Sequence, residues 1–98
     1  MFLELNEVKR HLNIDDYYTL DDGYIESLIE SCTAIMEEET GRKASELEGS
    51  ALGTARQAVL LLIGDYFATR ESAVIGASVA ERPMGFIRLC RLIRNYAK

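Results

Sequence analysis

Acidic side chains are the most concentrated chemical groups in this sequence of 98 residues. Four aspartates lie between Asp15 and Asp22, and carboxylates this close together could bind Ca²⁺. Their spacing does not follow that of an EF-hand loop, and no glutamate stands at the closing bidentate position. We therefore interpret these aspartates as helix caps and turn residues, and we predict no metal site.

Groups suited to acid–base or nucleophilic catalysis are sparse. Glu37, Glu38 and Glu39 are consecutive, so on a helix they point in different directions and cannot work as a pair. They are interpreted as an acidic patch that faces either solvent or another subunit. His11 is the only histidine, and no GxSxG, HExxH, P-loop or dinucleotide motif accompanies it. The sequence therefore predicts no enzyme, no catalytic residue and no cofactor; an enzyme of novel type would need a pocket where His11 meets a carboxylate or a cysteine.

Arginines recur every three residues near the end of the chain, at Arg88, Arg91 and Arg94. They could contact phosphate groups, contact carboxylates of a neighbouring subunit, or form the solvated side of a helix. A small helical DNA-binding regulator that uses this helix is the alternative function. The net charge of −5 counts against it, because non-specific DNA affinity comes mostly from neutralising phosphates.

The two halves of the chain carry opposite charge. Residues 1–49 contain 13 acidic and 4 basic side chains, a net of −9, whereas residues 50–98 contain 3 acidic and 7 basic ones, a net of +4. This polarity could be neutralised within one fold or between copies packed head to tail. The sequence leaves both arrangements open.

The composition predicts one helical domain over residues 1–98. A single proline and seven glycines offer too few turns for a sandwich or barrel. No secretory signal and no membrane-spanning stretch is recognised, which makes the cytosol the default location. Cys32 and Cys90 fall on apolar helix faces and are expected to be buried, reduced thiols.

Hydrophobic periodicity predicts an all-α bundle of about four helices, two long and two short. We expect a short helix over 7–12 capped by Asn6, a turn-rich connection over 13–23, and a long helix that Gly41 ends in a left-handed conformation. A polar loop over 42–49 leads to a second long helix, capped by Ser50 and running to about Arg70. Pro83 is expected in the first turn of the last helix.

The helix over 55–71 is apolar almost all the way round. Six apolar residues run without interruption from Ala58 to Ile63, so no single partner helix can cover them. Either the rest of the domain or another subunit must cover them, and for a chain of 98 residues we expect a subunit interface to supply part of the cover. Gly64 lies in the helix interior, where glycine costs about 1 kcal/mol relative to alanine, and its expected use is close approach of another backbone, of this chain or of a neighbouring subunit.

The segment over 72–81 loses the helical period. It is small and apolar, and we expect it to be extended or poorly ordered in an isolated subunit. Val74, Ile75 and Val79 are too apolar for a simple spacer. An extended segment of this kind could pair with a neighbour's matching segment once the protein assembles.

Several short motifs in order resemble the small head–tail connector, or adaptor, proteins of tailed bacteriophages and prophages. They span about residues 3–94 and are the following: Leu5-Asn6-Glu7-Val8-Lys9, His11-Leu12-Asn13-Ile14-Asp15, Leu28-Ile29, Thr40-Gly41-Arg42, Arg56-Gln57-Ala58-Val59-Leu60-Leu61-Leu62, Tyr66 and Arg70-Glu71. Each motif is weak alone, but their order and spacing are fairly specific.

The resemblance implies a helical, non-enzymatic subunit that forms a ring, usually twelvefold, beneath the portal. Such a ring extends the DNA channel without sequence-specific DNA binding, and it offers a platform to the next neck or tail-completion protein. The expected location is the virion neck, with the host cytoplasm before assembly, and neither a membrane nor a cofactor is involved. Candidate residues for contacts between subunits or with the portal are Glu37, Glu38, Glu39, Arg42, Gly64, Arg70, Val74, Ile75, Val79, Arg88, Arg91 and Arg94.

Overall fold

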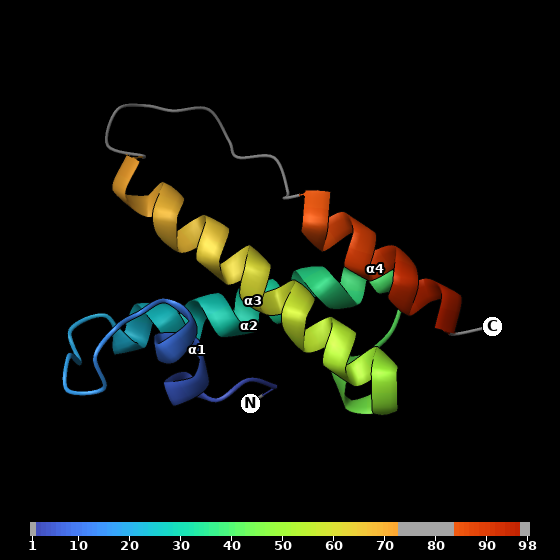
Figure 1. Ribbon diagram of the computed structural model, residues 1–98, viewed down its shortest axis with the longest axis horizontal. Helices are drawn as coiled ribbons and strands as arrows, with labels where there is room; N and C mark the ends of the chain where they lie inside the picture. The colour runs from blue at the N-terminus through green and yellow to red at the C-terminus, as the bar shows by residue number, and fades with distance from the viewer. Residues whose placement is uncertain (1, 73–83, 97–98) are drawn as a thin grey trace.

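The computed structural model describes residues 2–72 and 84–96, and within these ranges it is an all-α bundle without strands (Figure 1). The elements are α1 (Leu5–His11), α2 (Asp22–Thr40), a 3-10 turn η1 (Ala44–Glu46), α3 (Gly49–Ser72) and α4 (Met84–Tyr96). Two long and two short helices confirm the predicted fold class. The segment over 73–83, with the predicted extended loop and Pro83, lies outside the described residues.

The start of α1 differs from the prediction, because Glu4 and not Asn6 precedes the helix. The backbone N–H of Glu4 donates to Glu7 Oε1 at 3.3 Å, so the glutamate three residues on satisfies a group that the helix leaves unpaired. Asn6 lies inside the first turn. The helix therefore begins two residues earlier than the asparagine pattern indicated.

Gly41 ends α2 as predicted. Its φ of 69° is left-handed, and its N–H donates to the carbonyl oxygen of Glu37 at 2.9 Å. The expected polar loop follows, but η1 forms within it. Helix α3 then begins at Gly49, which has a φ of 58°, so Ser50 is a helical residue and not the cap that the sequence predicted.

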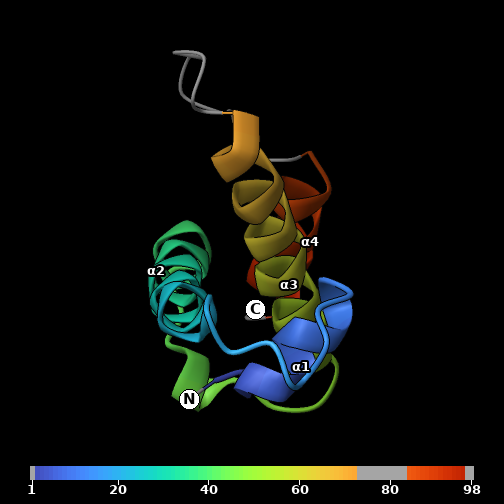
Figure 2. The same cartoon turned by 90° about the vertical axis from the view of Figure 1, so that its left-hand side faces the viewer.

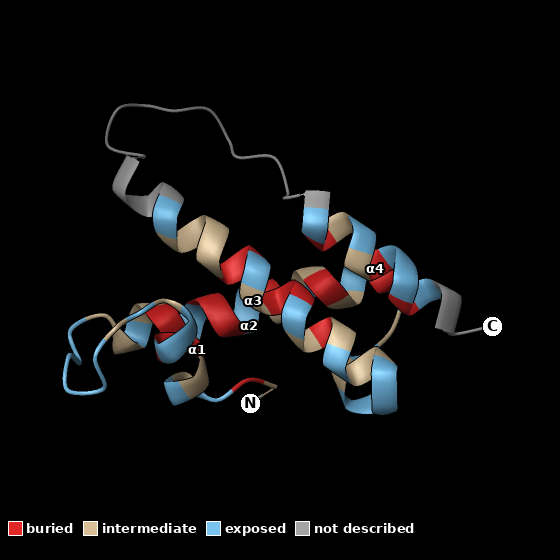
Figure 3. Ribbon diagram, in the orientation of Figure 1, coloured by how far each residue is buried: buried red, intermediate tan, exposed pale blue. Residues whose placement is uncertain are grey.

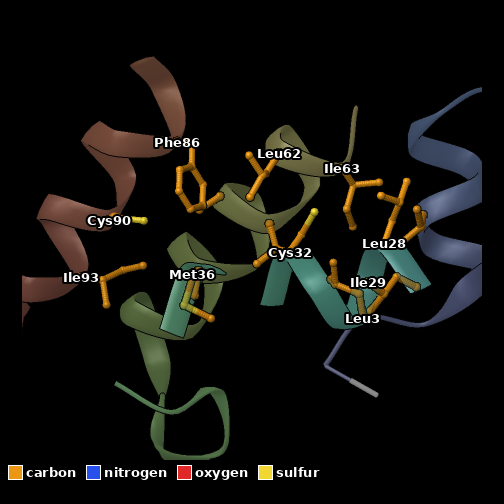
Figure 4. Close-up of a cluster of buried hydrophobic side chains, with 14 of the residues drawn as sticks. Leu3, Leu28, Ile29, Cys32, Met36, Leu62, Ile63, Phe86, Cys90 and Ile93 are labelled. Carbon is orange, nitrogen blue, oxygen red and sulfur yellow. The ribbon is translucent and has the colours of Figure 1, made fainter. Parts of the chain in front are cut away.

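Helix α3 lies at the centre of the bundle and packs against α1, α2 and α4. Figure 2, viewed from the end that carries the α1–α2 connection, shows α2 standing beside α3. The buried residues follow these contacts and separate from exposed ones along every helix, as Figure 3 shows. The core in Figure 4 joins Leu62 and Ile63 of α3 to Cys32 and Met36 of α2 and to Phe86 of α4.

The apolar run of α3 is covered mostly by its own chain. Ala58, Val59, Leu62 and Ile63 are fully buried, and Leu60 is half-buried. Only Leu61 remains exposed, at 40 %. The rest of the domain therefore supplies most of the cover, because α1, α2 and α4 all pack against α3.

Candidate assembly surfaces

The connection between α1 and α2, residues 12–21, is the first candidate surface, and we call it the loop surface. It lies at the opposite end of the molecule from α4 (Figure 1). Tyr17 and Leu20 are 92 % and 83 % exposed, the highest values among the large apolar side chains of the described residues. The same connection contains no basic residue. It contains four acidic or amide-bearing residues, which are Asn13, Asp15, Asp16 and Asp21.

The buried side chain of Lys9 binds the backbone of this loop. The side chain is 4 % exposed, and its Nζ donates to the carbonyl oxygens of Asp16 at 3.1 Å and Tyr18 at 2.7 Å. The same Nζ lies 3.0 Å from Asp22 Oδ1, in the first turn of α2. That oxygen is buried and makes no aligned hydrogen bond within the described residues, so the lysine charge is what compensates it.

A second ion pair ties the amino-terminal segment to α3. The guanidinium of Arg56 pairs with the carboxylate of Glu7, and its Nη1 donates to the carbonyl oxygen of Phe2 at 3.4 Å. Contacts between residues about 50 positions apart fix α1 against the centre of the bundle. Arg56 is the first residue of one of the motifs that resemble the connector family, and its contacts with Glu7 and Phe2 give this residue a structural role.

The predicted acidic patch is divided by the fold. Glu37 Oε2 accepts a hydrogen bond from the backbone N–H of Ala44 at 2.7 Å, so this side chain fixes the turn after α2. Glu38 is exposed and Glu39 is half-buried. The three glutamates therefore differ in their surroundings, and Glu38 is the most exposed of them.

The remaining predicted residues lie in several places. Arg42 is half-buried, and Arg88, Arg91 and Arg94 are exposed along α4. Arg70 lies in α3, but its side chain is outside the described part of the structure, as are Val74, Ile75 and Val79 altogether. The three arginines of α4 thus share the exposed side of one helix, whereas the three glutamates belong to α2.

Gly64 is approached by a side chain and not, within the described residues of this chain, by the expected backbone. A Cβ built on Gly64 would lie 3.6 Å from His11 Nε2. This is ordinary van der Waals contact, so glycine leaves room for the ring without being strictly required. The exposed His11 also lines a shallow, open hollow with Glu7, Arg10 and Leu60, but the carboxylate there is paired with Arg56.

Cys32 and Cys90 are buried and reduced, as the sequence predicted. Burial raises the pKa of the Cys32 thiol to about 12, which keeps it protonated and unreactive at neutral pH. No three His, Cys, Asp or Glu side chains converge on a possible metal site in the ranges 2–72 and 84–96. Over the same ranges, no helix has both the length and the apolar character that crossing a membrane requires.

Comparison with known protein families shows what these features belong to. Residues 2–96 match the family model described as phage gp6-like head-tail connector protein. The chain belongs to that family. No curated protein and no solved structure matches the chain significantly. The protein is therefore a connector of the phage head–tail junction, a structural component, and the suspected resemblance is confirmed.

The sequence interpretation missed Lys9, Tyr17 and Leu20. The sequence did contain a signal for an ion pair of Lys9. This lysine directly follows the buried Val8 in a short helix, and four aspartates that could pair with it come soon after. The exposure of Tyr17 and Leu20 was less clearly indicated by the sequence. Apolar residues in a turn usually fold back onto a core, and only the tertiary structure shows that these two do not.

Proposed function

We propose that this connector assembles as a single domain, residues 1–98, into a closed ring of subunits in the neck of the virion. The ring extends the DNA channel between the portal and the tail, with the twelvefold count that the family resemblance implies. The portal protein and the next neck or tail-completion protein are its docking partners. Catalysis plays no part in this role, and the DNA passes without sequence-specific binding.

The observation that carries the proposal is the separation of charge in space. The acidic loop surface lies at one end of the molecule and the exposed arginines of α4 lie toward the other, in a protein that belongs to a connector family. Heterologous contacts between different surfaces generate rings when the rotation between neighbours closes. Charges at opposite ends therefore support repeated head-to-tail contacts between copies.

Light scattering combined with negative-stain imaging at several concentrations tests the proposal. We expect oligomers that grow with protein concentration, end at a closed ring and weaken as salt rises, because exposed charges are screened over about 10 Å at 0.1 M salt. A strictly monomeric protein at high micromolar concentration and low salt would refute ring assembly by the isolated chain.

Single charge reversals identify the acids involved. Glu38→Arg reverses an exposed charge, whereas reversal of Glu37 would also remove the hydrogen bond to Ala44 and disturb the turn. Weaker assembly of Glu38→Arg with unchanged stability would place this side of α2 at an interface. Unchanged assembly would assign Glu38 to a solvated surface.

DNA binding through α4 is the second candidate function, and the exposure of Arg88, Arg91 and Arg94 is the observation in its favour. A binding titration with duplex DNA at several salt concentrations separates the two candidates. A DNA regulator would bind tightly, with an affinity that falls steeply with salt. We expect only weak binding from this acidic protein.

A further inference from the structure

The loop surface exposes two large apolar side chains that no other described part of the chain covers. The α1–α2 connection lies at one end of the molecule (Figure 1), and its Tyr17 and Leu20 are 92 % and 83 % exposed. Single exposed apolar residues are common on proteins, but this pair lies within four consecutive positions and is bordered by acidic residues. Such an arrangement is typical of a docking surface with a polar rim.

The loop is held in place although its outer side chains have no cover. Lys9 binds two of its carbonyl oxygens, and Asp15 Oδ1 accepts from the N–H of Tyr17 at 3.0 Å. A turn bond from the N–H of Tyr18 to the Asp15 carbonyl oxygen, also 3.0 Å, closes the bend. Because the backbone is already ordered, docking would lose little conformational entropy.

Helix α4 carries the complementary properties on its outer side, and we call this the α4 surface. It consists of Arg88, Arg91 and Leu92, which lie on one face at helical spacing, with Leu92 44 % exposed. No acidic residue occurs between 84 and 96. Leu61 of α3, 40 % exposed, lies beside the first turn of α4, since a Cβ on Gly85 would be 3.4 Å from its Cδ1.

Resting on the proposed ring assembly, we propose that the loop surface of one copy docks on the α4 surface of the next copy. Tyr17 and Leu20 would cover Leu92 and Leu61, while Asp16 pairs with the arginines. Arginine also stacks on tyrosine rings, so Tyr17 suits a guanidinium neighbour. The occupant of the loop surface is therefore a second copy of this chain.

Charge decides how the two copies meet. Two loop surfaces facing each other would bring acids against acids, and two α4 surfaces would bring arginines against arginines, both unfavourable. Pairing the unlike surfaces avoids both arrangements. It also leaves the α4 surface of one copy and the loop surface of the other unused, so the contact repeats from copy to copy.

Two complementary variants test this pairing. The loop variant combines Asp16→Arg with Tyr17→Ser, and the α4 variant combines Arg88→Glu with Arg91→Glu. All four side chains are exposed, so both variants should keep the urea midpoint of the wild type. Glu30→Arg, a reversal of an exposed acid on α2, is the matched control and should assemble normally.

We expect each variant alone to be monomeric in analytical ultracentrifugation where the wild type assembles, with association weakened roughly a hundredfold or more, since several contacts at the interface centre are lost. An equimolar mixture should recover association. The intact loop surface of the α4 variant meets the intact α4 surface of the loop variant, and the two changed surfaces carry opposite charges, so they do not repel each other.

The outcomes separate this inference from the proposed function. If the wild type never assembles, ring formation fails and the pairing fails with it. If the wild type assembles but the variants assemble equally well, or if both are monomeric and their mixture stays monomeric, the pairing is wrong and ring formation stands. A loop variant that assembles normally but no longer binds portal-containing heads would assign the loop surface to a different protein, which also overturns the pairing.

A photo-crosslinking amino acid at position 17 provides an independent readout that does not depend on charge reversal. Position 17 is almost fully exposed, so the replacement should not disturb folding. We expect crosslinked peptides from assembled protein to join position 17 to residues of α4. Crosslinks confined to other helices would overturn the pairing even if assembly is normal.

Discussion

Replacing Lys9 by methionine tests the contact that holds the α1–α2 connection. Methionine keeps most of the aliphatic volume but removes the ammonium group, so the change isolates one ion pair and two hydrogen bonds. Breaking a buried ion pair by removing one partner costs about 3–5 kcal/mol. Asp22 is 25 % exposed, so water can partly solvate its carboxylate, and we take the lower end, about 3 kcal/mol.

Urea denaturation followed by circular dichroism measures this cost. With an m-value of about 1–2 kcal/mol/M, 3 kcal/mol lowers the urea midpoint by roughly 1.5–3 M. This is a large share of the total, because domains of this size unfold with about 5–15 kcal/mol. The matched control is Arg10→Met on the same helix, where the exposed side chain makes only a 3.4 Å bond to the Asn6 carbonyl oxygen and should cost less than about 0.5 kcal/mol.

A double-mutant cycle shows whether the ion pair carries the effect. Asp22→Asn removes the carboxylate charge that Lys9→Met would leave uncompensated, so the double variant should be less destabilised than the sum of the single changes by about 1 kcal/mol or more. A Lys9→Met cost below about 1 kcal/mol, together with additive single changes, would refute the reasoning. The loop would then be held by its backbone turns alone.

Three further predictions concern helix ends and buried groups. Gly41→Ala should destabilise by about 1 kcal/mol because φ is 69°, whereas Gly53→Ala in α3 should stabilise by about 0.5–1 kcal/mol, both measured by urea unfolding. Above pH 9 the unfolded Cys32 thiol loses its proton while the folded one keeps it, because its pKa is about 12. The free energy of unfolding should therefore fall with rising pH by about 1.4 kcal/mol per unit more in the wild type than in Cys32→Ala; equal slopes would contradict the raised pKa. Glu37→Gln should weaken the turn bond to the Ala44 N–H and cost about 0.5–1.5 kcal/mol, and Glu38→Gln at an exposed position should cost nothing measurable; equal costs would contradict the assigned bond.

The sequence alone determined the fold class and most helix positions. Apolar spacing of three and four marked the inner faces of α2 and α4, and Cys32 and Cys90 are buried where this spacing put them. Gly41 marked the end of α2, because a left-handed residue there favours glycine. These features are local, so they depend on residues that are close in the chain.

Helix starts were predicted less well. Asn6 and Ser50 are good capping residues, yet Glu4 and the positive φ of Gly49 set where α1 and α3 begin. Several neighbouring residues can satisfy the same free N–H groups, and the packing of the helix selects among them. Capping preferences therefore indicated each start only to within one or two residues.

Only the tertiary structure decided which exposed features matter. Three consecutive glutamates suggested one acidic surface, but Glu37 bonds to a backbone N–H seven residues away and leaves Glu38 exposed. Lys9 became the centre of the α1–α2 connection because α2 brings Asp22 within 3.0 Å of its ammonium group. Hydrophobic periodicity reports which side of a helix is buried, whereas ion pairs and the exposure of Tyr17 depend on how separate segments meet in space, and local sequence does not encode that.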